Sequence, residues 1–270
     1  MAGDADLART LCLRQPGSTY RFALRFFPEL ELRMTRTRGT PTQGDAGDAA
    51  FAGVAIVDDA GKFVFCAPGE PRRLLWGLSE WAKSAADRLP AAAALIGSGA
   101  APWEGGTLLD PARLAIRRDD ALWSGVANPG PEQTARVLSG CAPGDRLWYW
   151  LTDEPGASGL PVLLQPARDD PNRDFLNALI DVVALGEPGP AETGIAYATV
   201  DGEIQFLGAG LRRAHLDALA AWVGDEAGRH PELGRIAGAR LLRTTAGRVQ
   251  AAIEDATVWD GVARPAPTGG

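Results

Sequence analysis

Hydrophobic and polar residues alternate along residues 20–26 and again along residues 30–35. A period of two residues is typical of β-strands that bury one face and expose the other. Pro28 and Glu29 separate the two segments. The pattern therefore predicts two adjacent strands joined by a turn.

A hairpin followed by a helix is predicted for residues 53–81. Residues 59–61, with the sequence Asp-Ala-Gly, lie between two apolar runs, and Asp and Gly together are a strong hairpin signal. From Leu74 onward, apolar residues recur every three or four positions, which is typical of an amphipathic helix. Pro71 is well suited to the first turn of that helix.

The same pattern returns at residues 194–222. Five identical pairs are each separated by 141 positions: Gly53 and Gly194, Gly61 and Gly202, Gly69 and Gly210, Trp81 and Trp222, and Pro90 and Pro231. One constant spacing without a gap indicates a tandem duplication rather than shared composition. Nearer the N-terminus the separation is 127 positions, as for Leu11 and Leu138, so residues 146–151 and 160–165 correspond to the first two strands.

Each repeat is predicted to run helix, hairpin, hairpin, helix, hairpin. The last hairpin is expected at residues 113–117 with 121–126 in the first repeat, and at 240–244 with 248–255 in the second. This order predicts an α+β fold, a tandem duplication of a two-layer unit with an antiparallel sheet and helices on one face. Strands that alternate in polarity argue against a parallel sheet buried on both faces.

The repeat also sets the predicted domain boundaries. We expect four segments: a first α+β unit (1–126), a Pro/Gly linker (127–130), a second α+β unit (131–262) and a disordered tail (263–270). The two copies diverge between their strand pairs. Residues 39–50 predict a loop, whereas residues 172–183 of the second copy predict an amphipathic helix.

The composition narrows the function classes. The chain has 270 residues, 46% of them hydrophobic, and a formal net charge of −7. This acidic balance makes nucleic acid an unlikely partner, because such binding requires basic surface. No run of about 18 apolar residues predicts a membrane span. The start of the chain lacks a signal-peptide pattern, and three cysteines without CxxC spacing favour a reduced, cytoplasmic protein. Abundant Ala, Gly, Arg and Pro suggest a bacterial source.

No catalytic or metal-ligating constellation is evident. His215 and His230 occupy the places of Leu74 and Leu89 in the first repeat, which is typical of helix packing positions. No Gly-x-Ser-x-Gly elbow, P-loop, strand-linked GxGxxG motif or HExxH helix occurs. We therefore predict no catalytic residue, no metal and no cofactor, while a function that only the second unit carries stays open.

A glycine-rich turn in the second unit is a candidate anion site. Gly208 and Gly210 lie between a predicted strand and a predicted helix, followed by Arg212 and Arg213. Main-chain N–H groups at a helix N-terminus bind anions such as phosphate. The alternative interpretation is that the two arginines are ordinary solvent-facing residues of the first helical turn.

The first strand pair carries a basic stripe. Six arginines and only two acidic residues lie between positions 14 and 38. Arg21, Arg25 and Arg33 are predicted to form a docking surface for an acidic protein partner, although charge also guards sheet edges against aggregation. The corresponding strand of the second unit is aromatic, and Trp148 and Trp150 are predicted as a second contact surface if that face is exposed.

These observations favour a non-catalytic protein-interaction or adaptor/chaperone-like module built from two pseudo-symmetric repeats. One alternative is an enzyme, a hydrolase or transferase, with its site in a cleft between the repeats. Another is a small-ligand or nucleotide sensor that uses the glycine-rich turn. A homo-oligomer is compatible with each of these hypotheses.

Overall fold

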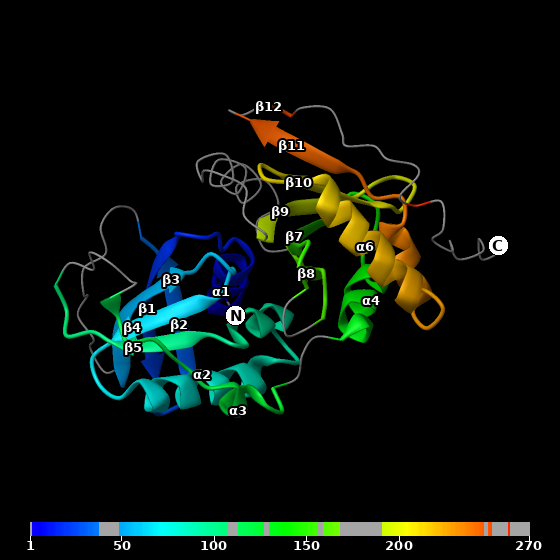
Figure 1. Ribbon diagram of the computed structural model, residues 1–270. Coiled ribbons are helices and arrows are strands. Elements are labelled where there is room, and N and C mark those ends of the chain that lie inside the picture. The colour runs from blue at the N-terminus through cyan, green and yellow to red at the C-terminus, as the bar shows by residue number, and fades with distance from the viewer. Residues whose placement is uncertain are drawn as a thin grey trace. The chain divides into compact units, whose positions relative to one another are not determined.

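The computed structural model describes residues 2–37, 49–106, 113–126, 130–155, 159–167, 191–245, 248–249 and 259. The chain divides into two compact units, Met1–Asn128 and Pro129–Gly270 (Figure 1). Each unit contains a six-stranded sheet together with helices, which confirms the α+β class. None of the described helices is long and apolar enough to cross a membrane.

The first unit has the strand order β2-β1-β3-β4-β5-β6. Its elements are α1 (Ala2–Cys12), β1 (Thr19–Arg25), β2 (Glu31–Arg36), β3 (Phe51–Val57), β4 (Phe63–Ala67), α2 (Pro71–Ala85), the 3-10 helix η1 (Pro90–Leu95), β5 (Gly99–Pro102), β6 (Arg117–Arg118) and α3 (Asp120–Trp123).

The second unit has the order β8-β7-β9-β10-β11-β12, which repeats the connectivity of the first. Its elements are α4 (Pro131–Ser139), β7 (Arg146–Thr152), β8 (Val162–Pro166), β9 (Ala191–Ala198), β10 (Ile204–Gly208), α6 (Arg213–Glu226), the 3-10 helix η3 (Pro231–Ile236), β11 (Leu241–Thr245) and β12 (Arg248–Val249).

Strand registers agree between the units residue by residue. Val54 faces Cys66 across β3 and β4, and Ile195 faces Leu207 across β9 and β10, each residue 141 positions from its counterpart. These pairings support the duplication hypothesis.

One pair of matched glycines, Gly53 and Gly194, is required for the same steric reason in both units. A Cβ atom on Gly53 would lie 2.0 Å from the Cys66 carbonyl oxygen, and one on Gly194 would lie 2.3 Å from the Leu207 carbonyl oxygen. Neither contact is sterically possible, so only glycine lets the paired strands approach this closely.

The sheets are mixed rather than wholly antiparallel. β4 pairs in parallel with β5, and β10 pairs in parallel with β11. A hairpin cannot join parallel neighbours, so α2 with η1 forms the crossover in the first unit and α6 with η3 forms it in the second. The rest of each sheet is antiparallel, as expected.

The last predicted hairpin of the first unit is wrong. Residues 120–123 form the helix α3, and the strand beside β4 is β5. We missed β5 because its sequence, Gly-Ala-Ala-Pro, has low β propensity and owes its conformation to the neighbouring strand. In the second unit, β11 confirms the strand at 240–244, and β12 confirms the start of the strand predicted at 248–255.

Several predictions fall on residues outside the described part of the chain. They are most of the loop at 39–50, most of the linker at 127–130, the helix at 172–183, the end of the strand at 248–255 and the tail at 263–270.

The helices of the first unit cover one face of its sheet. Tyr20 and Leu24 point to the same side of β1: the Tyr20 hydroxyl donates to the Leu13 carbonyl after α1, and Leu24 lies against Gly77 of α2. α2 begins at Pro71. The Glu70 carboxylate accepts hydrogen bonds from the main-chain N–H groups of Arg72 and Arg73 and thereby caps the helix. Its apolar stripe is buried, as predicted from the spacing of Leu74 and its successors.

The aromatic cores of the two units also correspond. Phe22 packs edge-to-face on Phe65 with ring centroids 5.0 Å apart, and Tyr149 packs on Phe206 at 5.1 Å. Trp81 and Trp222 are both buried, at 2% and 9% exposure. The opposite face of the first sheet is buried in part by a separate cluster that includes Val54, Cys66, Ala101 and Trp103.

Candidate functional site

The three arginines predicted as a docking surface lie on β1 and β2 of the first unit. Arg21 and Arg33 are exposed and Arg25 is half-buried. Their alternation with Phe22 and Leu24, which are buried, places Arg21 and Arg25 on the sheet face opposite to α1 and α2. The structure thus brings the two exposed guanidinium groups onto one side of a two-stranded ribbon.

A hollow of about 210 Å³ lies between Arg21 and Arg33. Its floor includes two small residues that face each other across β1 and β3, Ala23 and Ala52. Two cations beside a small depression form a suitable site for a carboxylate side chain.

Among the described residues, Arg33 is paired with Glu31. Its Nε donates to Glu31 Oε1 at 2.8 Å, and this hydrogen bond raises the pKa of Arg33. The Arg33 side chain is 68% exposed. Ion pairs in such exposed positions contribute little to stability, so a carboxylate from another protein can replace Glu31 at low cost.

A second hollow, of about 750 Å³, runs along β2, which is the edge strand of the sheet. Residues 30–35 line it without interruption, and Leu7 of α1 and Trp81 of α2 line its helix side. Its volume lies within the range of pockets that bind ligands. The edge strand is therefore accessible along its length.

The tip of the same hairpin exposes aromatic side chains. Phe27 is 82% exposed and Trp76 of α2 is 49% exposed. Phe26, which precedes Phe27 in the chain, packs against Trp76 with ring centroids 5.9 Å apart. The Arg73 guanidinium carbon lies 5.7 Å from the centroid of the Phe26 ring. Exposed aromatic side chains that neighbour one another are typical of interaction sites.

This aromatic tip is a property of the first unit. The residues at the corresponding positions of the second unit are acidic: Asp153, Glu154 and Asp217. The two units therefore present different chemistry on the same frame.

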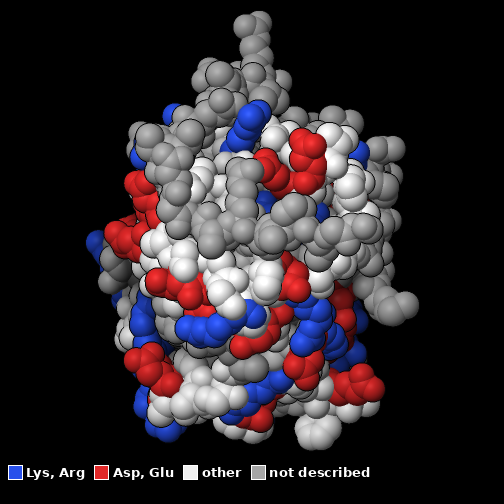
Figure 2. All heavy atoms as spheres, turned by 90° about the vertical axis from the view of Figure 1, so that its right-hand side faces the viewer, with Lys and Arg blue, Asp and Glu red and all other residues white. Residues whose placement is uncertain are grey.

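Positive and negative side chains are mixed on the face shown in Figure 2. There, Lys and Arg side chains are interspersed with Asp and Glu side chains. Because the chain has a net charge of −7, binding of an acidic partner depends on a local basic cluster such as Arg21 and Arg33.

Trp148 and Trp150 do not form the open aromatic face expected from the sequence. They are only 4% and 7% exposed. β7 pairs with β8 on one side and β9 on the other, and all its residues after Arg146 are buried. Both faces of this strand are covered, whereas the sequence interpretation assumed one covered face.

The groups of the predicted anion site contact acidic residues of the chain itself. The Gly210 N–H donates to Glu192 Oε1 at 2.9 Å. Arg212 forms an ion pair with Asp153, and Arg213 Nε lies 3.1 Å from Asp217 Oδ1. A Cβ atom on Gly208 would lie 2.2 Å from the Tyr149 hydroxyl oxygen, so this glycine also makes room for a core residue.

Glu192 is a feature that the sequence interpretation missed. Its side chain is buried, at 2% exposure. Burial raises the pKa of Glu192 to about 7, although the N–H groups of Gly210 and Ala209 and the charges of Arg243 and Arg212 oppose the rise. The 141-residue repeat offered a signal that Glu192 is buried, because the corresponding residue of the first unit is the apolar Phe51.

Tyr149 accompanies Glu192 in the core of the second unit. The Tyr149 hydroxyl is buried and has no hydrogen-bond partner among the described residues, and burial raises its pKa well above the ordinary value. The corresponding residue of the first unit is Phe22. The second unit thus keeps two ionisable groups where the first has phenylalanine.

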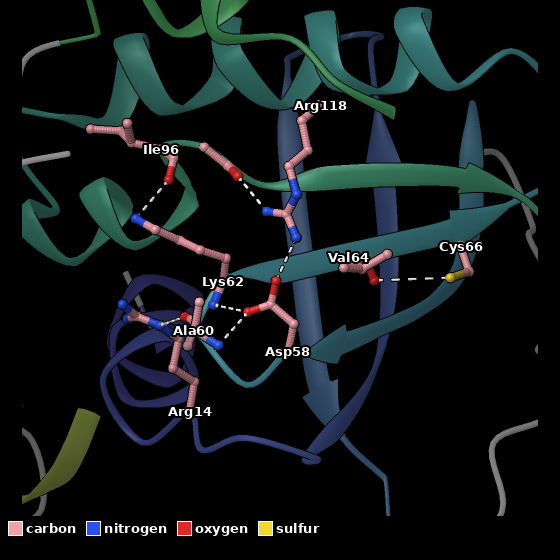
Figure 3. A network of polar contacts seen from close by, with 10 residues as sticks. Arg14, Asp58, Ala60, Lys62, Val64, Cys66, Ile96 and Arg118 are labelled. Atoms are coloured by element: carbon pink, nitrogen blue, oxygen red, sulfur yellow. Dashed lines mark hydrogen bonds and ion pairs between the residues drawn. The ribbon is translucent and has the colours of Figure 1, made fainter. Parts of the chain in front are cut away.

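A polar network surrounds the β3–β4 turn of the first unit (Figure 3). Asp58 Oδ1 accepts from the main-chain N–H groups of Ala60 and Lys62, while Oδ2 pairs with Arg118 at 2.5 Å. Lys62 Nζ donates to the Ile96 carbonyl at 3.0 Å. Burial and the nearby Arg14 lower the pKa of Lys62 to about 8. Because each of these groups bonds to the main chain or to a neighbour, the network holds the turn in place.

Histidine and cysteine chemistry finds no support in the described residues. His215 is buried, and its Nδ1 accepts from the Arg212 N–H at 3.0 Å, so it caps α6. Burial raises the pKa of Cys12 and of Cys66 to about 12, which keeps both thiols protonated. No group of three His, Cys, Asp or Glu side chains in the described part of the chain is placed to hold a metal ion.

Protein-family models, curated proteins and solved structures were compared with the chain. None of them matches it. The function is therefore inferred from the geometry of the first unit's β1–β2 hairpin.

Proposed function

We propose that the protein is a non-catalytic interaction module whose first unit binds an acidic segment of a partner protein through the β1–β2 hairpin. The observation that carries this proposal is the pair of exposed guanidinium groups, Arg21 and Arg33, on either side of the hollow of about 210 Å³. Charge-assisted hydrogen bonds to a carboxylate are about twice as strong as neutral ones, so this site selects for acidic side chains.

The exposed aromatic tip adds apolar contact to the same surface. Phe27 and Trp76 lose accessible surface only if a partner covers them. Burial of apolar area favours association, while the charged pair supplies orientation. An adaptor role follows from the second unit, which has the same frame but different side chains at the corresponding positions.

A triple charge reversal, Arg21→Glu with Arg25→Glu and Arg33→Glu, tests the proposal. The full-length variant should stay folded by circular dichroism, because polar-face strand positions contribute little to stability. In pull-downs from native lysate it should capture about tenfold less of the acidic proteins that the wild type captures. Added salt should weaken wild-type capture in the same direction.

A matched control carries three exposed arginines of the second unit changed to glutamate: Arg213, Arg229 and Arg240. It has the same change in net charge and should capture partners as the wild type does. Equal loss in both variants would show a general charge effect, and no loss in the hairpin variant would refute the proposed surface.

A further inference from the structure

The hydrogen-bond pattern shows which main-chain groups of β2 point away from the sheet. The Thr37 N–H donates to the Thr19 carbonyl, so Thr19 and Thr37 form a hydrogen-bonded pair. In an antiparallel ladder, hydrogen-bonded and non-hydrogen-bonded pairs alternate. Counting from that pair, Phe22 with Met34 and Leu24 with Leu32 are non-hydrogen-bonded pairs. The main-chain N–H and C=O groups of Leu32 and Met34 therefore point away from β1, outward from the edge of the sheet.

The opposite side of β1 confirms this assignment. The Leu24 and Ser18 carbonyls accept from Ala50 and Val57, on the β3 side of β1. Even-numbered residues of β1 therefore bond toward β3, and odd-numbered residues bond toward β2. Among the described residues, no strand pairs with the outer edge of β2.

The two faces of this edge differ in polarity. Leu32 and Met34 are buried, and they line the larger hollow together with Leu7 and Trp81. The charged residues Asp4, Asp6 and Arg88 also line the wall of the same hollow. Arg33 points to the other face, where it lines the smaller hollow with Arg21. An added strand would place alternate side chains beside the apolar row and beside the arginines.

The corresponding edge of the second unit has one outward N–H group fewer, because a proline lies there. Pro166 is the last residue of β8 and faces Leu147 as Arg36 faces Tyr20 in the first unit, so its missing N–H lies on the outer edge. Proline has no N–H to offer, and proteins use it to protect sheet edges from pairing. β2 has no proline, so the N–H groups of Leu32, Met34 and Arg36 can all bond outward.

We infer that the β2 edge accepts an extended partner segment of alternating apolar and acidic residues as an additional strand. This inference rests on the proposed function and specifies the ligand of that surface. Main-chain hydrogen bonds to Leu32 and Met34 supply affinity, as in other strand-addition complexes. The apolar residues of the segment lie along Leu32 and Met34, and its carboxylates lie beside Arg33 and Arg21.

Two synthetic octapeptides of the same composition, both acetylated at the N-terminus and amidated at the C-terminus, test the inference on the full chain. In the first, glutamate and valine alternate; in the second, all the glutamates precede all the valines. We expect the alternating peptide to bind more tightly by about tenfold in fluorescence anisotropy. Binding should slow amide hydrogen exchange at Leu32 and Met34, while Glu31, Arg33 and Thr35, already bonded to β1, should change little.

Arg36→Pro gives the β2 edge the proline that β8 has at the corresponding position. The Arg36 N–H points outward, so the change should leave the β1–β2 pairing intact and weaken the alternating peptide by about three- to tenfold, the value of about one hydrogen bond. Arg36→Ala removes the charge but keeps the N–H. Comparing it with Arg36→Pro separates the effect of the lost charge from that of the lost main-chain hydrogen bond.

No binding of the alternating peptide, equal binding of both peptides, or an Arg36→Pro variant that binds like Arg36→Ala would overturn strand addition. These results would leave acidic-partner capture by the arginines intact. Failure of the triple charge reversal to reduce capture would instead refute the proposed function.

Discussion

Arg14 of the first unit and Arg235 of the second donate hydrogen bonds to corresponding main-chain carbonyls, although the two arginines are not at corresponding positions of the repeat. Arg14 donates to the Gly61 carbonyl at 2.8 Å and to the Leu11 carbonyl at 2.7 Å. Arg235 donates to the carbonyls of Gly202 and Leu138, which are the repeat counterparts of those two residues.

The donors themselves are not counterparts. Cys141 occupies the place of Arg14 in the second unit, and Ala94 occupies the place of Arg235 in the first. A guanidinium group that joins the hairpin turn to the end of the first helix is thus present in both units. It satisfies carbonyls at a helix C-terminus, which have no partner within the helix.

Arg14→Ala should destabilise the protein by about 2 kcal/mol, because it leaves buried carbonyls without their charged donor. Chemical denaturation of the purified variant measures this loss. Arg213→Ala, an exposed arginine, is the control and should change stability by less than about 0.5 kcal/mol. A loss for Arg14→Ala no larger than that of the control would show that the contacts are not needed.

Transfer of the second unit's arrangement to the first tests the correspondence directly. Arg14→Cys combined with Ala94→Arg places the donor where Arg235 lies. If the units are equivalent, this double variant should be more stable than Arg14→Cys alone in the same denaturant assay. A double variant less stable than the single variant would mean that the first unit cannot accept the donor at position 94.

Glu192 should make stability depend on pH. Its pKa is raised to about 7 in the folded protein, above the ordinary value of 4.5, so the folded state favours the protonated acid. The contribution of this group is fully present below about pH 4.5 and is lost as the pH rises to about 7, a difference of about 3 kcal/mol. Tyr149, Arg212 and Arg243 are the other ionisable groups that act on it.

Glu192→Gln should remove this dependence, because the amide has nearly the same size and its oxygen can still accept from the Gly210 N–H. Denaturant melts of wild type and variant at pH 5 and pH 8 give the comparison. The variant should gain stability relative to wild type at the higher pH. The control variant Glu154→Gln, changed at an exposed position, should show no such gain in stability at the higher pH. A wild-type minus Glu192→Gln difference that is constant with pH would refute the shifted pKa.

Trp81→Ala and Trp222→Ala should each destabilise the protein by about 3–5 kcal/mol, as truncation of buried aromatic side chains does. Trp76→Ala provides a control on the same helix as Trp81, since Trp76 is 49% exposed. Its loss should be below about 1 kcal/mol. A small loss for Trp222→Ala would indicate an exposed side chain and would reopen a binding role for it.

The two units should superpose in experimental coordinates, with β1–β5 on β7–β11 and Trp81 on Trp222. The equal strand order and the shared registers lead to this expectation. Unrelated environments for the two tryptophans would contradict the duplication.

Local signals in the sequence determined the α+β class, the β1–β2 and β3–β4 pairs and the two long helices. Side chains alternate between faces every two residues in a strand and return to one face every three to four in a helix, so burial on one face leaves a readable period. The constant spacing of the glycines determined the repeat, since Gly53 and Gly194 are required by close strand approach.

Tertiary structure decided the features that depend on distant segments. The pairing of β4 with β5 lies across a helical crossover, and no local pattern encodes it. Trp148 and Trp150 are buried because the fold covers both faces of β7, as the burial of successive residues along the strand shows. The shifted pKa of Glu192 arises because the fold removes its carboxylate from water beside Gly210, 18 positions away. The open edge of β2 likewise exists only in the assembled sheet, because strand order, not sequence, determines which strand lies last.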